Sequence, residues 1–173
     1  MIARRLARDL GYRVSGEVFV GALLHDMGIS VLHEHFHDEY KRIVEIAGTT
    51  ELTWCEAEES VLGVSHAAIG GWLAERWNFP PALVEAVAKH HSPLDAKDNP
   101  ELVGIIHCAD VFAHRLGAET MIFDKGLDFN PEVLQRLNLN DPVAMDEYLA
   151  TYRKNIQTDV EEFASLSSAV KEQ

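Results

Sequence analysis

Six histidine and aspartate residues have the types and spacing of a metal-binding set. They are an adjacent pair, a single histidine, a second adjacent pair and a distal aspartate: His25 and Asp26, His66, His90 and His91, and Asp110. Imidazole nitrogens mixed with carboxylate oxygens suit Fe, Mn, Zn, Ni or Co better than Ca or Mg. We therefore expect a divalent transition-metal site, in which carboxylate bridging would allow two ions.

Helical periodicity places the two aspartates on apolar rows. Asp26 follows Phe19 by seven residues and Leu23 by three, and Asp110 follows Val103 by seven. Burying a carboxylate is costly unless a cation, strong donors or a proton compensates it. Two such aspartates in one small domain therefore favour a shared cation.

The pair His25–Asp26 needs other helices to complete one site. Adjacent residues on a helix point about 100° apart, so both reach one ion only if it lies close to the helix surface. Gly28, one turn further on, would permit a close approach of that kind. The second His-Asp pair, His37–Asp38, lies in the polar stretch LHEHFHDEY and is expected to be a solvated turn or helix start.

Several of these histidines also have an ordinary structural interpretation. His66 would cap its helix, and His90 and His91 would favour a helix C-terminus, where protonated imidazole is stabilised. Asp110 would bond a histidine one turn away on its own helix. The alternating histidines of the polar stretch, His33 and His35 with His37, would form a histidine-rich surface loop or bind metal adventitiously.

The elements that must position these residues are all predicted to be helices. No segment alternates apolar and polar residues long enough to predict a strand, so we expect an all-α, multi-helix bundle. Thr53 to Glu56 has the form of a capping box, Ser65 is a candidate N-cap, and Asn-Pro and Asp-Pro pairs mark later helix starts. Helices are expected over 2–10, 17–32, 40–47, 54–63, 66–77, 81–91 and 100–116, with further starts at 131 and 142.

Two regions are expected along the chain. Residues 1–120 would form the helical domain, with its N-terminal helix truncated, because an apolar stripe begins at the first residues without an N-cap. Residues 121–173 would form a C-terminal helical extension. Its 3-to-4 apolar spacing predicts one long amphipathic helix that packs on the domain or on a partner, through Met145, Leu149, Tyr152, Ile156, Val160 and Phe163.

Composition limits the classes of partner and compartment. The 173 residues are 47% hydrophobic and carry a formal charge of −13, which argues against nucleic acid and anionic membranes as partners. Cys55 and Cys108 lie far apart without a CxxC motif, as expected for reduced thiols in a cytoplasmic protein. No apolar run approaches the ~20 residues of a membrane span, and no signal peptide is visible.

Three segments together resemble the HDOD domain, a relative of the HD-GYP phosphodiesterases within the HD superfamily of metal-dependent phosphohydrolases. They are GALLHDMG (21–28), GVSHAAIGGWLAERWNFPPALVEAVAKHHSP (63–93), which follows Glu59, and HCADVFAHRLG (107–117). The resemblance covers about residues 3–117. It implies a helical bundle in which the signature His-Asp pair, the added His, the double His and the distal Asp bind metal, at His25, Asp26, His66, His90, His91 and Asp110.

The chain also departs from the HD-GYP pattern. Ile29 stands where those enzymes carry a lysine near the phosphate, and no GYP triplet follows. Lys89 and Arg115 are the nearest candidates to replace that lysine. The first superfamily histidine would fall upstream of Met1.

The resemblance leaves two functional hypotheses. The first is a regulatory module of a larger bacterial signalling protein, which binds a protein partner, neighbouring domains or a nucleotide ligand. The second is a metal-dependent phosphohydrolase or phosphodiesterase acting on a nucleotide or cyclic nucleotide, with metal-bound water as the nucleophile.

Overall fold

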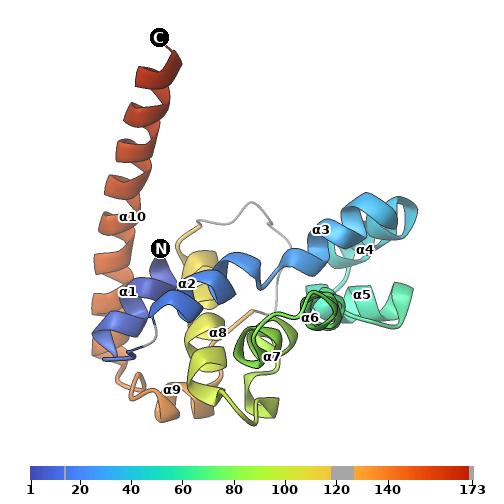
Figure 1. Ribbon diagram of the computed structural model, residues 1–173, viewed down its shortest axis with the longest axis horizontal. Coiled ribbons are helices and arrows are strands. Elements are labelled where there is room, and N and C mark those ends of the chain that lie inside the picture. Colours follow the sequence, from blue (N-terminus) through green and yellow to red (C-terminus); the bar gives the residue numbers. More distant parts are fainter. Residues whose placement is uncertain (14, 118–126, 172–173) are drawn as a thin grey trace.

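The computed structural model describes residues 1–13, 15–117 and 127–171. Within these ranges all regular elements are helices and there is no strand, which confirms the all-α prediction (Figure 1). In chain order they are α1 (Ile2–Asp9), α2 (Ser15–Leu24), α3 (Met27–His35), α4 (His37–Thr49), α5 (Trp54–Leu62), α6 (His66–Arg76), α7 (Pro81–Lys89), the 3-10 turn η1 (Pro93–Asp95), α8 (Pro100–Arg115), α9 (Pro131–Arg136) and α10 (Pro142–Lys171).

The helix starts follow the capping residues in most places. The capping box before α5 is complete, because Thr53 N donates to Glu56 at 2.8 Å and Thr53 Oγ1 accepts from Glu56 N at 3.2 Å. Ser65 caps α6 by accepting from the amide of Ala68. Asn99 does not cap α8 as predicted, because its side-chain amide instead donates to Glu85 at 3.1 Å.

The predicted helix over 17–32 is wrong at its centre. The chain forms α2 and α3 with a break at His25 and Asp26, where Asp26 has φ −95° and ψ 12°. The apolar row used to place Asp26 faces solvent, since Phe19 is 43% and Leu23 68% exposed. Asp26 is therefore oriented by the break in the helix and not by helical phase. The predicted helix over 40–47 is also too short, because α4 begins at His37 and ends at Thr49.

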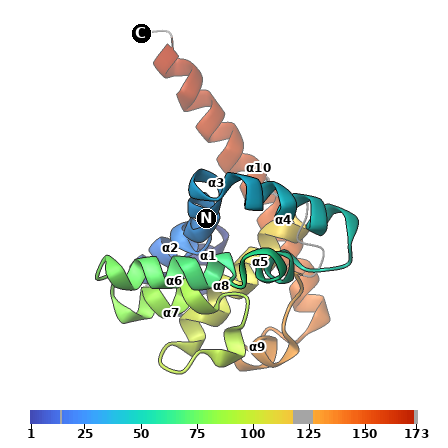
Figure 2. The same cartoon turned by 90° about the vertical axis from the view of Figure 1, so that its right-hand side faces the viewer.

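The main core surrounds α8, whose residues 102–109 are buried. In Figure 2 the ribbon of α8 passes through the middle of the helical body. Side chains of α1, α2, α7, α9 and the base of α10 pack with it in one cluster. Tyr152 of α10 is 1% exposed and donates a hydrogen bond to Asp9 at the end of α1, at 3.1 Å. Both views show the distal part of α10 extending away from this body.

A second, smaller core joins α4 to α5. It consists of Ile43 and Ala47 from α4 and Trp54 and Ala57 from α5. None of the described helices combines the length and apolar composition needed to cross a membrane.

Gly28 fixes the distance between α3 and α6. A Cβ at this position would lie 2.0 Å from the carbonyl oxygen of His66, a contact with backbone that no side-chain rotation can relieve. The glycine therefore allows the first turn of α3 to lie directly against the first turn of α6.

We predict that Gly28→Ala destabilises the fold by about 2–3 kcal/mol, as overpacking typically does. The matched control is Gly16→Ala in α2, where a Cβ would meet nothing within 4 Å. Alanine there is expected to be neutral or to stabilise by up to about 1 kcal/mol, since it favours helix over glycine. Urea unfolding measures both free energies, and equal values for the two variants would contradict this account of the α3–α6 contact.

Candidate metal centre

The six residues singled out in the sequence come from four places in the fold. His25 and Asp26 occupy the break between α2 and α3, His66 begins α6, His90 and His91 directly follow α7, and Asp110 lies in α8. They form two overlapping groups whose potential ligand atoms lie within 4.8 Å of one another: Asp26, His66, His90 and His91, and His25, Asp26 and Asp110. Asp26 belongs to both groups.

In three of the histidines, the Nδ1 atom is bound to an acceptor outside the cluster. Nδ1 of His25 donates to Ala22 O at 2.9 Å, and Nδ1 of His90 donates to Val87 O at 2.8 Å. Nδ1 of His66 lies 2.7 Å from Glu58 Oε2. Because a carbonyl only accepts, Nδ1 carries the hydrogen in these pairs, which leaves Nε2 of a neutral ring as a lone pair facing the cluster.

The Nε2 atoms converge at distances that need a hydrogen or a cation between them. His66 Nε2 lies 3.1 Å from His91 Nε2 and 3.4 Å from His90 Nε2. Asp26 Oδ1 lies 3.4 Å from both His66 Nε2 and His90 Nε2. Facing lone pairs repel one another unless a proton or a cation lies among them, and the donor set of nitrogens and one carboxylate oxygen fits a transition-metal ion.

The second group uses the other oxygen of Asp26. His25 Nε2 lies 3.2 Å from Asp26 Oδ2 and 3.4 Å from Asp110 Oδ1. The two oxygens of Asp26 thus face different sets of ligand atoms. A carboxylate placed in this way could bridge two metal ions, one at each group of ligand atoms.

The electrostatics favour a proton on two histidines of the metal-free cluster, His25 and His66, and oppose one on His90 and His91. Burial opposes protonation of His25, but the carboxylates of Asp110 and Asp26 outweigh it and raise the pKa of His25 to about 10. Burial, reinforced by His90 and His66, lowers the pKa of His91 to about 2. Burial also opposes ionisation of Asp26, yet His25, His66 and His90 hold the pKa of Asp26 well below its ordinary value. Asp26 is therefore anionic and His91 neutral, as ligands must be, whereas His25 and His66 would release a proton when an ion binds.

The cluster is closed on one side and reachable on the other. The side chains of His66 and His90 are 1% and 0% exposed, whereas that of Asp26 is 45% exposed. Beside the exposed part lies a hollow of about 300 Å³, lined by His25, Asp26 and Asp110 and otherwise by apolar residues: Met1, Ile2, Ala3, Ala22, Ile106, Ala109, Ala113 and Ile156. Neither lysine nor arginine is among these lining residues.

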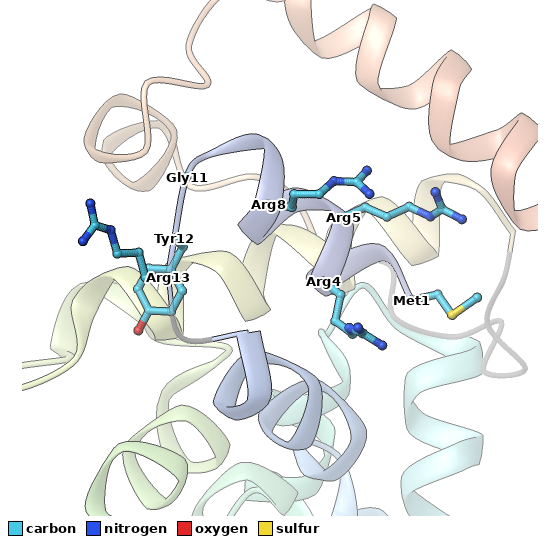
Figure 3. Close-up of a pocket in the computed structure, with 7 residues that line it drawn as sticks. All are labelled: Met1, Arg4, Arg5, Arg8, Gly11, Tyr12 and Arg13. Atoms are coloured by element: carbon cyan, nitrogen blue, oxygen red, sulfur yellow. The ribbon is translucent and has the colours of Figure 1, made fainter.

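A second hollow, on the outer face of α1, has the opposite chemistry. It measures about 560 Å³ and is lined by Met1, Arg4, Arg5, Arg8, Gly11, Tyr12 and Arg13 (Figure 3). The arginine side chains in this view point in different directions: Arg4 projects to the opposite side of α1 from Arg5 and Arg8, and Arg13 lies at the far end. They do not converge on one point as the histidines do, so the metal-type cluster is the more definite site.

Arg115, one of the two cations that could replace the missing lysine, is engaged by other residues. Arg115 is paired with Asp128, and its guanidinium lies 4.4 Å from the centre of the Phe129 ring. Its charge is thereby directed to the loop before α9. Lys89 ends α7 directly before His90, and Ile29, in the lysine's position, is half-buried in α3.

The other His-Asp pair is a solvated helix start, as predicted. His37 and Asp38 begin α4, and both are exposed. His33 and His35, at the end of α3, are exposed as well, although they belong to a helix and not to a loop. The two identical dipeptides therefore differ in environment, and only His25–Asp26 enters a cluster of ligand atoms.

Two buried polar residues of the site were missed in the sequence. Glu58, 0% exposed, receives His66, and its position four residues after Trp54 and four before Leu62 on one apolar face would have been the signal. His107 is also buried, and its Nδ1 donates to His90 O at 2.9 Å while its Nε2 accepts from Asn130 N at 3.3 Å. His107 thus holds the backbone of His90. Asp110, one turn further along the same helix, faces His25.

The comparisons with known proteins agree with this fold. A crystal structure of an HDOD domain protein from Geobacter sulfurreducens matches with a TM-score of 0.62 and 22% identity, over 86% of this chain and 57% of that one. A candidate phosphohydrolase from Shewanella amazonensis SB2B matches with a TM-score of 0.63 and 24% identity, over 87% of this chain and 55% of that one. These likenesses concern the fold.

Sequence comparison gives a narrower match. An uncharacterized protein of Treponema pallidum (strain Nichols) is 25% identical over 103 residues, which are 59% of this chain and 20% of that protein. The chain thus spans about a fifth of the length of this relative. The family model of the HDOD domain matches residues 1–93, more than half of the chain. The chain therefore belongs to the HDOD domain family.

Proposed function

We propose that this chain is an HDOD-type regulatory domain that holds a divalent transition metal. The ligands of the metal would be His25, Asp26, His66, His90, His91 and Asp110. The observation that carries the proposal is the convergence of the Nε2 atoms of His66, His90 and His91 on Asp26 Oδ1, with Nδ1 of His66 and His90 hydrogen-bonded on the outer side. Fe, Mn, Zn, Ni and Co all suit this donor set.

A regulatory role is favoured over catalysis by what surrounds the cluster. Ile29 takes the place of the phosphate-side lysine, and the adjacent hollow has no lysine or arginine among its lining residues. Phosphoryl transfer relies on positive groups that stabilise the negative charge developing on the phosphate. In this chain the metal ions alone would have to supply that positive charge. We infer that the domain acts through its helical surface on a protein partner or on other domains of a larger signalling protein.

The metal proposal predicts a selective effect of Asp26→Ala. Untagged protein is expected to bind Zn²⁺, Mn²⁺ or Co²⁺ stoichiometrically, and at 100 times the Kd the metal should raise the free energy of unfolding by about 2.7 kcal/mol. Asp26→Ala should weaken binding by more than about 100-fold, because loss of outer-shell partners alone weakens it about 10- to 100-fold. Calorimetric titration measures the Kd, and elemental analysis measures the metal content.

The matched control is Asp38→Ala, the same change in the surface His-Asp pair. It should leave the metal content and Kd unchanged, because Asp38 is exposed and outside the cluster. Equal metal binding by the two variants, or no stoichiometric transition metal in the unaltered protein, would refute the proposal.

A second candidate function, phosphodiester or phosphomonoester hydrolysis, is favoured by the position of Asp26. Its two oxygens face two different ligand groups, and two metal ions held in this way form the usual clamp for phosphoester hydrolysis. The match to a candidate phosphohydrolase concerns fold only, and the substrate would be a nucleotide or a cyclic nucleotide.

This second function predicts Mn²⁺-dependent turnover that depends on Asp110. Bis(p-nitrophenyl) phosphate, nucleotides and cyclic nucleotides are the substrates to test. Asp110→Asn should lower kcat at least 100-fold if one ion is held by His25, Asp26 and Asp110. Turnover that persists unchanged in Asp110→Asn would assign the activity to a contaminant, and no turnover with full metal loading would leave the regulatory role as the function.

A further inference from the structure

Glu58 is a fully buried carboxylate whose oxygens are both engaged by donors. Glu58 Oε1 accepts from Trp54 Nε1 at 2.8 Å. Glu58 Oε2 accepts from the backbone N–H of His66 and from His66 Nδ1, each at 2.7 Å. The side chain is 0% exposed, so these bonds compensate the burial of its charge.

These contacts fix both the position and the orientation of the His66 ring. One oxygen holds the backbone and the ring of the same residue, so the ring cannot turn without breaking a bond inside the protein. Its Nε2 is thereby directed at Asp26, His90 and His91, at 3.1 to 3.4 Å.

His66 differs in this respect from the two other histidines with an anchored Nδ1. His25 and His90 donate to the neutral backbone carbonyls of Ala22 and Val87, whereas His66 donates to a carboxylate. Hydrogen bonds to ionised acceptors are stronger, and a carboxylate on the outer nitrogen makes the inner nitrogen a better metal ligand. We therefore expect His66 to be the strongest metal ligand of these three histidines.

We propose that Glu58 is a positioning residue that holds His66 in the tautomer and orientation of a metal ligand and strengthens its bond to the ion. This inference rests on the proposed metal-binding function.

The test must separate the charge of Glu58 from its shape. Glu58→Gln alone would turn an amide NH₂ toward the N–H of Trp54 and create a clash of two donors. Trp54→Phe removes that donor, so Trp54→Phe and the double variant Trp54→Phe/Glu58→Gln form a matched pair. In both variants, the side-chain atom of residue 58 that faced the Trp54 N–H has lost this partner. The two variants then differ only in whether His66 donates to a carboxylate oxygen or to an amide oxygen.

Co²⁺ is the probe, titrated into untagged protein and followed by its visible absorption. Trp54→Phe should keep the Kd of the unaltered protein within about threefold, because the carboxylate still receives His66. The double variant should bind Co²⁺ about 10- to 100-fold more weakly and with a shifted ligand-field band. Equal Kd values and spectra for the matched pair would overturn the proposal.

A second measurement distinguishes failure of this inference from failure of the metal proposal. In metal-free protein with ¹⁵N-labelled histidine, the Nδ1–H proton of His66 should give a strongly downfield, slowly exchanging signal in Trp54→Phe. That signal should move upfield and exchange faster in the double variant. If the unaltered protein binds no Co²⁺, the metal proposal fails and with it the ligand role. An unchanged Nδ1–H signal in the double variant would show that Glu58 does not hold the ring.

Discussion

The close packing of imidazole Nε2 atoms around one carboxylate is the constraint that the helices near the site must satisfy. His66, His90 and His91 present these atoms within 3.4 Å of one another or of Asp26, in a region where His66 and His90 are inaccessible to solvent. Such a group is stable only with hydrogens or a cation between the facing atoms. The break between α2 and α3, the first turn of α6 and the end of α7 all lie where they deliver these ligand atoms.

The rest of the fold provides a rigid support for this arrangement. α8 forms the centre of the main core and carries Asp110 next to its buried residues, 102–109, 111 and 112. Gly28 lets α3 lie against the carbonyl of His66, and Glu58 holds the same residue from α5. Glu58 thus fixes both the backbone N–H and the ring of His66, while Asp26 remains the part of the site exposed to solvent.

The sequence predicted the helical class and most helix starts, because caps and apolar periodicity are local signals. The set of clustered residues followed from their types and spacing and from the resemblance to the HDOD domain. The sequence failed at His25–Asp26, where no proline or glycine marks the break and where the contacts of Asp26 with α6 and α7 decide the backbone path. Helical phase placed Asp26 beside Phe19 and Leu23, which are exposed. Glu58 was missed although it lies on an apolar face, because its partner His66 comes from the next helix. The stripe residues Val160 and Phe163 lie outside the side chains that the structure describes.

X-ray absorption of the Zn²⁺- or Co²⁺-loaded, untagged protein tests the central claim most directly. The account predicts a first shell of nitrogen and oxygen at about 2.0–2.2 Å, with the outer-shell scattering of several imidazole rings and no sulfur. A sulfur scatterer at about 2.3 Å would instead place the ion with Cys55, Glu58 and His66, the other group of potential ligands around this histidine. That result, or a shell without imidazole scattering, would contradict a metal centre built on Asp26, His66, His90 and His91.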